Sequence, residues 1–453
     1  MDNNALATEK PSKLLFSLAI PTVLAQLVNL LYNIVDRMYV GRIPGEGRLA
    51  LAGLGVTFPI IMLVSAFAAL IGMGGAPLAA IEMGKKDNKK AERILGSCTT
   101  ALFIVAMILT VLFMIFKEPI LIAFGASENT LPYASEYLSI YLIGTVFVQF
   151  ALGLNMFVTG QGFAKIGMAT VCIGALINIV LDPVFIFAFN MGVKGAALAT
   201  IIAQAVSAVW VLAFLCGKKT IIKIRFKNLL PDFKILLSVA SLGMSPFVMQ
   251  ATECLVQLTF NNGMLKYGGD IYVALMSILF SVMQFVWLPI QGFAQGAQPI
   301  LSYNYGAQNY DRVRKTFKIM FKCAVAFTVA IVAVIELFPQ IFVSMFTSDA
   351  EVIEIGKSGM RIFMAGMCVM GAQCACQQTF VALGEAKISL FLALLRKVIL
   401  LIPLAIILPT IGNLGTTGLF LAEAISDVLA ATTTVIIFSK RSKKLLLKGK
   451  ERK

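Results

Sequence analysis

Runs of about twenty or more apolar residues, the length that crosses a bilayer as a helix, recur along almost the whole chain between short polar segments. The pattern predicts an all-α polytopic membrane protein with twelve transmembrane helices. Several runs exceed about 25 residues, which indicates tilted helices. The expected helices fall at 14–39, 50–76, 95–116, 132–158, 167–189, 194–216, 236–263, 271–298, 317–339, 353–382, 388–410 and 414–438.

Composition supports this class of protein. The chain is 59% hydrophobic and 13% charged, which is more apolar than a soluble core requires. A net charge of +15 would suggest a nucleic-acid partner for a soluble chain, but thirty of the 38 Lys and Arg lie in alternate loops on one side of the expected membrane. We therefore expect no nucleic-acid partner, a multi-pass protein in contact with the lipid bilayer, and both termini in the cytoplasm.

The chemistry available to the chain is narrow. It contains no His, so any proton chemistry must use carboxylates. The eight Cys lie mostly within apolar runs and are interpreted as small hydrophobes, neither disulfides nor metal ligands. No DDxxD, HExxH or GxGD stretch is present, so the chain is not expected to be an enzyme. The polar N-terminal stretch lacks a cleavage signal, and the first helix is expected to remain in the mature protein.

The two halves of the chain repeat. Residues 75–93 align with 297–315 at a shift of 222, which places Pro77 and Gly84 on Pro299 and Gly306. Because the shift covers six expected helices, an even number, the halves enter the membrane in the same orientation, and a cavity between them could open alternately to each side. The expected units are an N-terminal lobe at 1–217, a cytoplasmic linker at 218–234, a C-terminal lobe at 235–439 and a basic cytoplasmic tail at 440–453.

An acid in the fifth expected helix is the strongest functional signal. Asp182 lies in a long apolar run, and Asn178 lies one turn earlier on the same helix face. Pro183 follows. Because proline has no backbone N–H, the carbonyl of Ile179 lacks its helical hydrogen bond, and a broken helix turn is expected there, before a turn at 190–192. An ionised carboxylate at bilayer depth costs about 2.5–3.5 kcal/mol, so a buried ion or proton site is predicted.

Two further residues could share that site. Thr200 in the sixth helix and Asp182 in the fifth both lie about 10 Å inside the membrane, with Asp36 of the first helix somewhat shallower. Two carboxylates, an amide and a hydroxyl form an all-oxygen set that suits sodium, and they equally suit two carboxylates that share a proton. The structural alternative is that Asp182 joins helices through hydrogen bonds.

The second half carries different acids. Glu253 lies in the seventh expected helix, and Glu423 lies in the twelfth, where the repeat places Thr200 in the first half. Asp427 follows Glu423 by one helical turn. These acids could form a second acidic site, could bind the cationic group of a substrate, or could pair with Arg396 or Lys397.

Amides form a stripe on the eighth helix and a group in the tenth. In lipid such side chains face the bundle interior, so they could line a cavity or form interhelical hydrogen bonds. The residues concerned are Gln284, Gln291, Gln295, Gln373 and Gln377.

Four features together resemble the multidrug and toxic compound extrusion (MATE) family. They are IPTVLAQLVNLLYNIVDRMYVG at 20–41, the repeated Pro-x6-Gly loop, NIVLDP in the fifth helix, and the GVKGAALAT stretch of the sixth with its partner in the twelfth. The resemblance covers nearly the whole chain. It implies a V-shaped transporter of two six-helix lobes, which exports small organic, often cationic, compounds by antiport with H+ or Na+. We expect the protein to be a monomer in the plasma membrane that needs no cofactor.

The resemblance also implies roles for particular residues. Asp36, Asn178, Asp182 and Thr200 match the cation-site cluster of the branch that keeps its key acid in the fifth helix, and Pro21 matches a proline linked to bending of the first helix. The alternative is a flippase or exporter of a lipid-linked or endogenous metabolite. Such a flippase should line its cavity with Arg and Lys, and the expected helices are poor in both.

Overall fold

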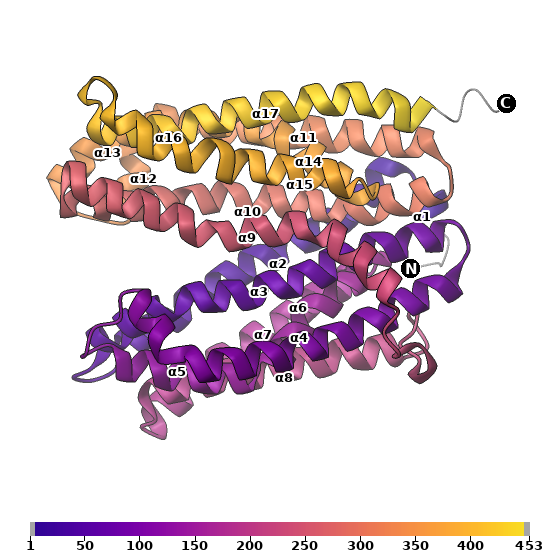
Figure 1. Ribbon diagram of the computed structural model, residues 1–453, viewed down its shortest axis with the longest axis horizontal. Coiled ribbons are helices and arrows are strands. Elements are labelled where there is room, and N and C mark those ends of the chain that lie inside the picture. The colour runs from indigo at the N-terminus through magenta and orange to yellow at the C-terminus, as the bar shows by residue number, and fades with distance from the viewer. Residues whose placement is uncertain (1–4, 448–453) are drawn as a thin grey trace.

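The computed structural model describes residues 5–447, and all the regular elements within that range are helices (Figure 1). Two short π-helices, η1 and η4, and three 3-10 helices, η2, η3 and η5, interrupt or join the α-helices. The elements are α1 (Ala5–Thr8), α2 (Pro11–Gly41), α3 (Gly47–Gly84), α4 (Asn88–Ala123), α5 (Leu131–Ile143), α6 (Thr145–Gly160), α7 (Ala164–Pro183), η1 (Val184–Ala188), α8 (Gly192–Cys216), η2 (Phe226–Asn228), α9 (Phe233–Gly268), α10 (Asp270–Gly306), α11 (Tyr310–Leu337), α12 (Pro339–Ser344), α13 (Ala350–Met364), η3 (Ala365–Val369), α14 (Met370–Ala382), α15 (Ala386–Leu394), η4 (Leu395–Leu401), α16 (Ile402–Ile407), η5 (Leu408–Asn413) and α17 (Gly415–Leu447).

The predicted all-α membrane fold is confirmed. Within the described residues, 11 helical segments are long and apolar enough to cross a membrane, and the pair α5 and α6, bent by 59° at Gly144, makes a twelfth. All twelve expected helices overlap one of these segments. The sequence did not predict the bend or the 3-10 break η3 within the tenth span. Of the expected basic tail at 440–453, residues 440–447 continue α17, and 448–453 lie outside the described residues.

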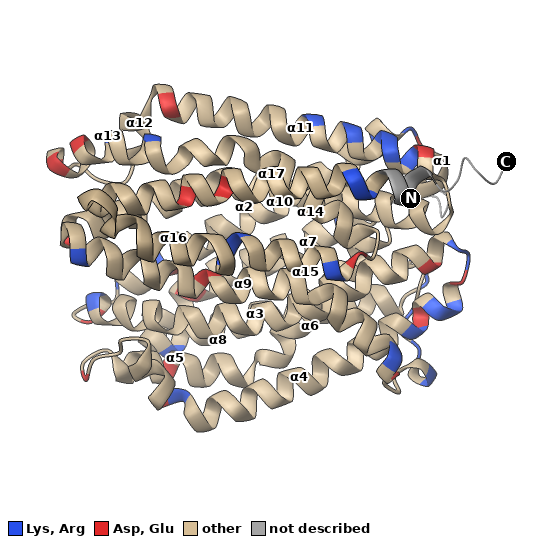
Figure 2. Ribbon diagram, turned by 45° about the horizontal axis from the view of Figure 1, so that its top comes forward, with Lys and Arg blue, Asp and Glu red and all other residues tan. Residues whose placement is uncertain are grey.

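The helices form two lobes, α2–α8 and α9–α17, which are drawn in indigo to magenta and in rose to yellow (Figure 1). The lobes contact each other mainly through α2 with α10 and through α3 with α9 and α10. Their ribbons diverge toward the end opposite α1, which gives the outline of a V (Figure 1). Charged residues gather at the two ends of the molecule, and Lys and Arg are most frequent at the end that carries α1 (Figure 2).

The internal repeat is visible in the backbone conformation of the loops. Most of the residues with positive φ in the described chain fall into pairs separated by 222–224 positions, as expected if both halves adopt the same loops. Lys86 and Gln308 both stand just past the ends of α3 and α10, where a left-handed residue ends the helix. The pairs are Gly45 with Gly269, Lys86 with Gln308, Gly162 with Gly384, Asn190 with Asn413, and Gly192 with Gly415.

The first helix of each half belongs to both lobes. Helix α2 packs against α10 of the other lobe and against α7 of its own, and α9 packs against α3 of the other lobe and against α15 of its own. The backbones approach closely where they cross. A Cβ on Gly296 of α10 would overlap Ala19 of α2, and a Cβ on Gly243 of α9 would overlap the carbonyl oxygen of Leu70 in α3. Small residues permit such close helix packing in membranes.

The N-terminal segment bridges the lobes at the same end. Leu6 is buried, and its backbone carbonyl accepts hydrogen bonds from Asn304 Nδ2 at 3.0 Å and from Arg312 Nη2 at 3.2 Å. Arg312 Nη2 also donates to the carbonyl of Glu9 at 2.6 Å. The Leu6 side chain lies against Gly162 in the loop between α6 and α7. Residues 5–9 therefore contact both lobes.

Candidate functional site

The candidate site in the N-terminal lobe is built on α7 and α8. Asn178 and Asp182 lie one turn apart on α7, and both are almost fully buried. Asn178 Nδ2 donates to Asp182 Oδ1 at 3.2 Å and lies 3.4 Å from Thr200 Oγ1 on α8. The common depth predicted for Asp182 and Thr200 is consistent with this contact.

Asp36 completes the cluster from α2. Its side chain is buried, and its carboxyl lies close enough to that of Asp182 for a single proton to join the two in a hydrogen bond. Three buried oxygen atoms of the cluster have no hydrogen-bond donor among the described residues: Asp36 Oδ1, Asn178 Oδ1 and Asp182 Oδ2. The structure thus brings together all four residues singled out in the sequence and leaves polar atoms unsatisfied between them, which is costly in a low-dielectric interior.

Sequence reasoning missed a set of tyrosines around these acids. Tyr32 lies one turn before Asp36 on α2, close enough to both carboxyls for their charges to act on its phenol. From α5, the Tyr137 hydroxyl lies beside Thr200 and faces Asp36, and its ring stacks on Tyr141 with centroids 6.4 Å apart. The i, i+4 spacing of Tyr32 and Asp36 could have identified the first of these. Nothing local in the sequence links Tyr137 to the site.

The regular α-helix is interrupted after Asp182, where the broken turn was expected, but the span does not end there. Helix α7 ends at Pro183, and the chain continues as the π-helix η1, with Phe189 N donating to the carbonyl of Val184 at 2.9 Å. A wider turn accommodates the proline ring and the unpaired carbonyl without ending the span. The predicted turn does follow, where Asn190 and Gly192 have φ of 55° and 56°.

An open cavity adjoins the cluster between α2, α6, α7 and α8, and the space within it, part of it open to solvent, is about 910 Å³. Gln295 of α10 also lines it and accepts a hydrogen bond from Gln26 Nε2 at 3.2 Å, a contact between the lobes. None of the described residues lining the cavity is charged. Its polar lining residues are Thr22, Gln26, Asn29, Tyr32, Asn155, Thr159, Thr170, Asn178, Thr200, Gln204, Ser207 and Gln295.

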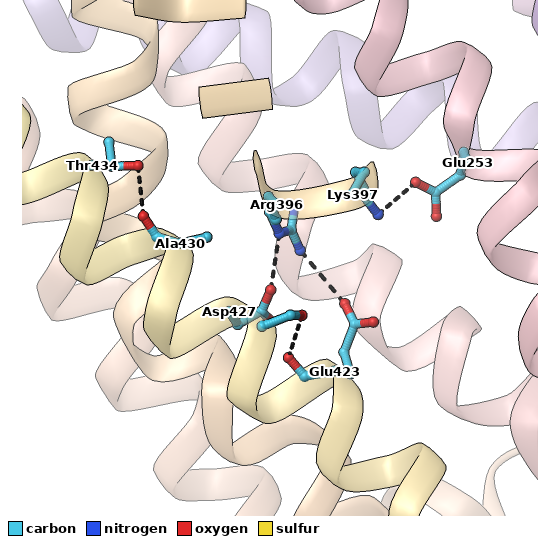
Figure 3. Close-up of polar contacts among 8 residues, drawn as sticks. Glu253, Arg396, Lys397, Glu423, Asp427, Ala430 and Thr434 are labelled. Atoms are coloured by element: carbon cyan, nitrogen blue, oxygen red, sulfur yellow. Dashed lines mark hydrogen bonds and ion pairs between the residues drawn. The ribbon is translucent and has the colours of Figure 1, made fainter. Parts of the chain in front are cut away.

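The C-terminal lobe contains a separate charged cluster (Figure 3). Arg396 Nε donates to Asp427 Oδ1 at 2.9 Å, and an Arg396 nitrogen lies 3.6 Å from Glu423 Oε1. Lys397 Nζ donates to Glu253 Oε2 at 2.9 Å. Arg396 and Lys397 are adjacent in the π-helix η4, and both are buried. The pairing with basic residues considered from the sequence is therefore present.

The pairing in this cluster is uneven. Three carboxyl groups face two basic groups, so the fully ionised cluster would carry one negative charge. Glu423 is fully buried, and neither of its carboxyl oxygens has a hydrogen bond among the described residues. The Arg396 guanidinium also lies over the ring of Trp287, 5.5 Å from the centroid. Glu423 is thus the least satisfied acid of the cluster.

The predicted amides occupy different places. Gln291, Gln373 and Gln377 line a second, much smaller cavity beside Trp287. Gln377 Nε2 also donates to Ser245 Oγ at 2.9 Å and to the Ser389 carbonyl at 2.8 Å, so it joins helices as well. Gln284 is exposed and lines neither cavity. Gln250, which the sequence did not single out, lines the second cavity.

Two remaining features bear on the site. Pro21 is buried inside α2, which is continuous from Pro11 to Gly41. No group of three or more Cys, Asp and Glu side chains within residues 5–447 is arranged to hold a metal ion. A transition-metal site would need such a group, whereas a sodium site can use amide, hydroxyl and carbonyl oxygens.

Comparison with known proteins identifies the family of the chain. The family model for MatE matches residues 21–184 and 247–407, one stretch in each lobe. The multidrug export protein MepA of Staphylococcus haemolyticus (strain JCSC1435) is 25% identical over 433 residues, which cover 95% of this chain and 94% of the relative. MepA of Staphylococcus aureus (strain MSSA476) is 24% identical over 426 residues, 94% of this chain and 93% of the relative.

Solved structures show the same fold over nearly the whole length. A structure of a multidrug resistance MATE family transporter of the MOP superfamily, in the outward-facing conformation, superimposes with a TM-score of 0.90 at 24% identity, over 98% of this chain and 99% of the other. A MOP superfamily transporter from Pyrococcus furiosus Vc1 (DSM3638) gives a TM-score of 0.91 at 25% identity, with the same coverage. The family model covers well over half of the chain, and the chain belongs to the MatE (MATE) family of membrane transporters, which are not enzymes.

Proposed function

We propose that this chain is a secondary antiporter that exports small organic, often cationic, compounds across the plasma membrane in exchange for H+ or Na+. Curated relatives that align over 94–95% of the chain are multidrug export proteins. In this proposal Asp36, Asn178, Asp182 and Thr200 bind the coupling ion. The chain then falls in the branch of the family that keeps its key acid in the fifth helix.

One observation carries the assignment of the site. Three unsatisfied buried oxygens, Asp36 Oδ1, Asn178 Oδ1 and Asp182 Oδ2, belong to side chains in mutual contact. Arg37, the basic residue next to Asp36 in sequence, is exposed. A proton between the two carboxyls, or a sodium ion among the oxygens, would satisfy these atoms and offset the repulsion between the acids.

The cavity beside the cluster is the proposed substrate site. It is open to solvent, and its lining combines apolar side chains with uncharged polar ones, as in sites that bind small organic molecules. Asn178 and Thr200 line it, so an ion and a substrate would compete through the same side chains. The absence of Lys and Arg from its described lining disfavours the flippase alternative, since a diphosphate group would need them.

The acids of the C-terminal lobe are a second candidate for coupling or for binding a substrate cation. The surplus carboxylate at Glu423 favours this role for Glu253, Glu423 and Asp427. The pairing with Arg396 and Lys397 favours a structural role. The two interpretations differ in what neutralisation of Glu423 would do to transport.

The topology is part of the same proposal. Lys and Arg concentrate at the end where α1 lies, so this end faces the cytoplasm. In this proposal the protein also acts as a monomer, and Pro21 bends α2 during transport. The proposed units are 1–217, 218–234, 235–439 and 440–453. Since the lobes contact at the α1 end and diverge at the other, the structure corresponds to the state closed toward the cytoplasm.

The test is transport by purified protein in liposomes, measured as movement of a cationic dye such as ethidium while a proton gradient and a sodium gradient are imposed separately. The wild type should respond to one gradient, which names the ion. Asp182→Asn and Asp36→Asn should respond to neither while inserting normally. Glu354→Gln, an exposed acid on α13, is the matched control and should behave as the wild type.

Two other results would change the proposal. Full-rate coupled transport by Asp182→Asn would remove the ion site from the N-terminal lobe. If Glu423→Gln then abolished the response to the gradient, coupling would belong to the C-terminal cluster. If the wild type moved no cationic dye, the proposed substrate class would be wrong.

A further inference from the structure

The segment between the two halves, residues 217–232, is an ordered part of the N-terminal lobe. Gln161 Oε1, at the end of α6, accepts hydrogen bonds from Thr220 Oγ1 and Ile221 N, both at 2.8 Å, and from Ile222 N at 3.0 Å. The buried Glu92 of α4 accepts from Arg225 Nε at 2.6 Å, and this hydrogen bond raises the pKa of Arg225. The segment is therefore fastened to α4 and α6 and cannot swing as a free tether.

This ordered segment presents unusual side chains. Phe226, Leu230 and Phe233 are 94%, 82% and 80% exposed, the three highest values among the large apolar side chains of the described chain. Lipid-facing residues of the helices, such as Leu176 at 64%, are less exposed because neighbouring turns cover them. The three residues lie close together in sequence at the α1 end, where the spans finish. The fold therefore leaves three large apolar side chains uncovered on a segment that it holds in place.

The charges around these apolar side chains have mostly one sign. Asp232 is the single acid between 217 and 234, and it caps α9 by accepting from Lys234 N and Ile235 N. Aromatic and leucine side chains among unpaired lysines form the composition that inserts into the headgroup layer of an anionic membrane. The basic side chains of this segment that have no ion-pair or hydrogen-bond partner among the described residues are Lys218, Lys219, Lys223, Lys227 and Lys234.

The start of helix α9 shows which surface the exposed apolar side chains adjoin. Leu237 lies one turn after Phe233 on the same face of α9 and is 61% exposed, a value typical of the lipid-facing side chains of this protein. The exposed apolar surface of the segment is therefore continuous with the lipid-facing surface of the membrane span. A soluble partner at this place would have to displace lipid from Leu237.

We propose that residues 225–234 form an anchor that inserts Phe226, Leu230 and Phe233 into the anionic headgroup layer of the membrane at the α1 end. The unpaired lysines around these side chains contact lipid phosphates. Through Gln161 and Glu92 the anchor fixes the end of the N-terminal lobe against the bilayer surface, beside the start of α9. The anchor is independent of which ion or substrate the transporter uses.

The test places a reporter in the anchor. The full-length protein carrying Phe226→Trp is labelled with fluorotryptophan and reconstituted in bilayer discs that contain anionic lipid, and fluorine NMR reads the introduced indole separately from the native Trp210 and Trp287. A lipid with a nitroxide on its headgroup should relax this reporter several-fold faster than a water-soluble gadolinium chelate does. Lys89→Trp, in an exposed first turn of α4 at the same end, is the matched control and should show the reverse.

The second part of the experiment varies the charge of the lipid. Replacing anionic by zwitterionic lipid, or Lys218, Lys219, Lys227 and Lys234 by Gln, should reduce the nitroxide effect on the anchor reporter at least twofold and leave Trp210 unchanged. The proposal is overturned if the reporter of Phe226→Trp responds to gadolinium as strongly as that of Lys89→Trp. It is also overturned if the anchor reporter is protected only at high protein density in the discs, which would indicate a second copy of the chain at this surface.

Discussion

Gly84 and Gly306 stand 222 positions apart, and each packs against the helix that ends with the other. A Cβ on Gly84 would overlap the carbonyl oxygen of Tyr303, and a Cβ on Gly306 would overlap that of Ile81, which is itself 222 positions before Tyr303. The contact is thus reciprocal, as expected for an axis that relates the two lobes. It brings the backbones of α3 and α10 together at the end where the lobes meet.

We expect Gly84→Ala to destabilise this junction, because the added methyl group meets backbone atoms that cannot rotate away. Overpacking of this kind costs about 1–3 kcal/mol. Thermal unfolding in detergent should show a lower midpoint for Gly84→Ala and for Gly306→Ala. Gly55→Ala is the control on the same helix, since nothing lies within 4 Å of its Cβ, and it should be neutral or slightly stabilising. Equal midpoints for Gly84→Ala and Gly55→Ala would contradict the reciprocal contact.

The tyrosines around Asp36 should tune ion binding. Tyr137→Phe removes the hydroxyl that lies beside Thr200 and faces Asp36, and a hydrogen bond of this kind contributes about 1 kcal/mol, or about a fivefold change in affinity. The ion concentration for half-maximal transport should rise by that factor while the maximal rate changes little. Tyr141→Phe keeps the stacked ring without touching the site and should resemble the wild type. A fivefold effect of Tyr141→Phe alone would reverse the assignment.

The charged cluster of the C-terminal lobe should be intolerant of losing its base. Arg396→Gln leaves Asp427 and Glu423 buried without a partner, and breaking a buried ion pair costs about 3–5 kcal/mol. Unfolding in detergent should show this loss, and Asp427→Asn added to Arg396→Gln should recover part of it. Lys357→Gln removes an exposed pair and should cost about 1 kcal/mol or less. Equal losses in the single and double variants would show that the two residues are not coupled.

The N-terminal segment should detach when Arg312 is changed. Arg312→Gln removes charged hydrogen bonds to the carbonyls of Leu6 and Glu9, each a class of bond that contributes about 1.5–3 kcal/mol. Amide hydrogen exchange in residues 5–9 should become at least about tenfold faster. Lys315→Gln, an exposed position on the same helix, should leave the exchange unchanged. Unchanged exchange in Arg312→Gln would mean that Asn304 and the burial of Leu6 suffice.

Local patterns in the sequence predicted much of this architecture. Apolar runs predicted the twelve spans, the shift of 222 predicted the two halves, and the i, i+4 spacing of Asn178 and Asp182 predicted their shared face. Thr200 could be added because membrane depth is readable from sequence. Tyr137 could not, because its approach to Thr200 depends on the bend at Gly144 and on how α5 packs against α8.

The charged cluster of the C-terminal lobe could likewise be predicted only in part from the sequence. Arg396 and Lys397 are neighbours in sequence, and an ordinary helix would turn their side chains about 100° apart. In the π-helix η4 both are buried, and they serve different partners, Asp427 and Glu253. A helix that widens by one residue leaves little trace in composition, so the pairing could be suggested from the sequence but not assigned.

The crossing of α2 and α9 bears on how the protein is made. While the ribosome has produced only the first half, the start of α2 lacks α10, and the glycine face of α3 lacks α9. The first half therefore has two small-residue surfaces without a protein partner until the second half is inserted. Separately expressed halves should therefore fold poorly alone and assemble when they are expressed together, because each half supplies the helices that cover the other's small-residue surfaces.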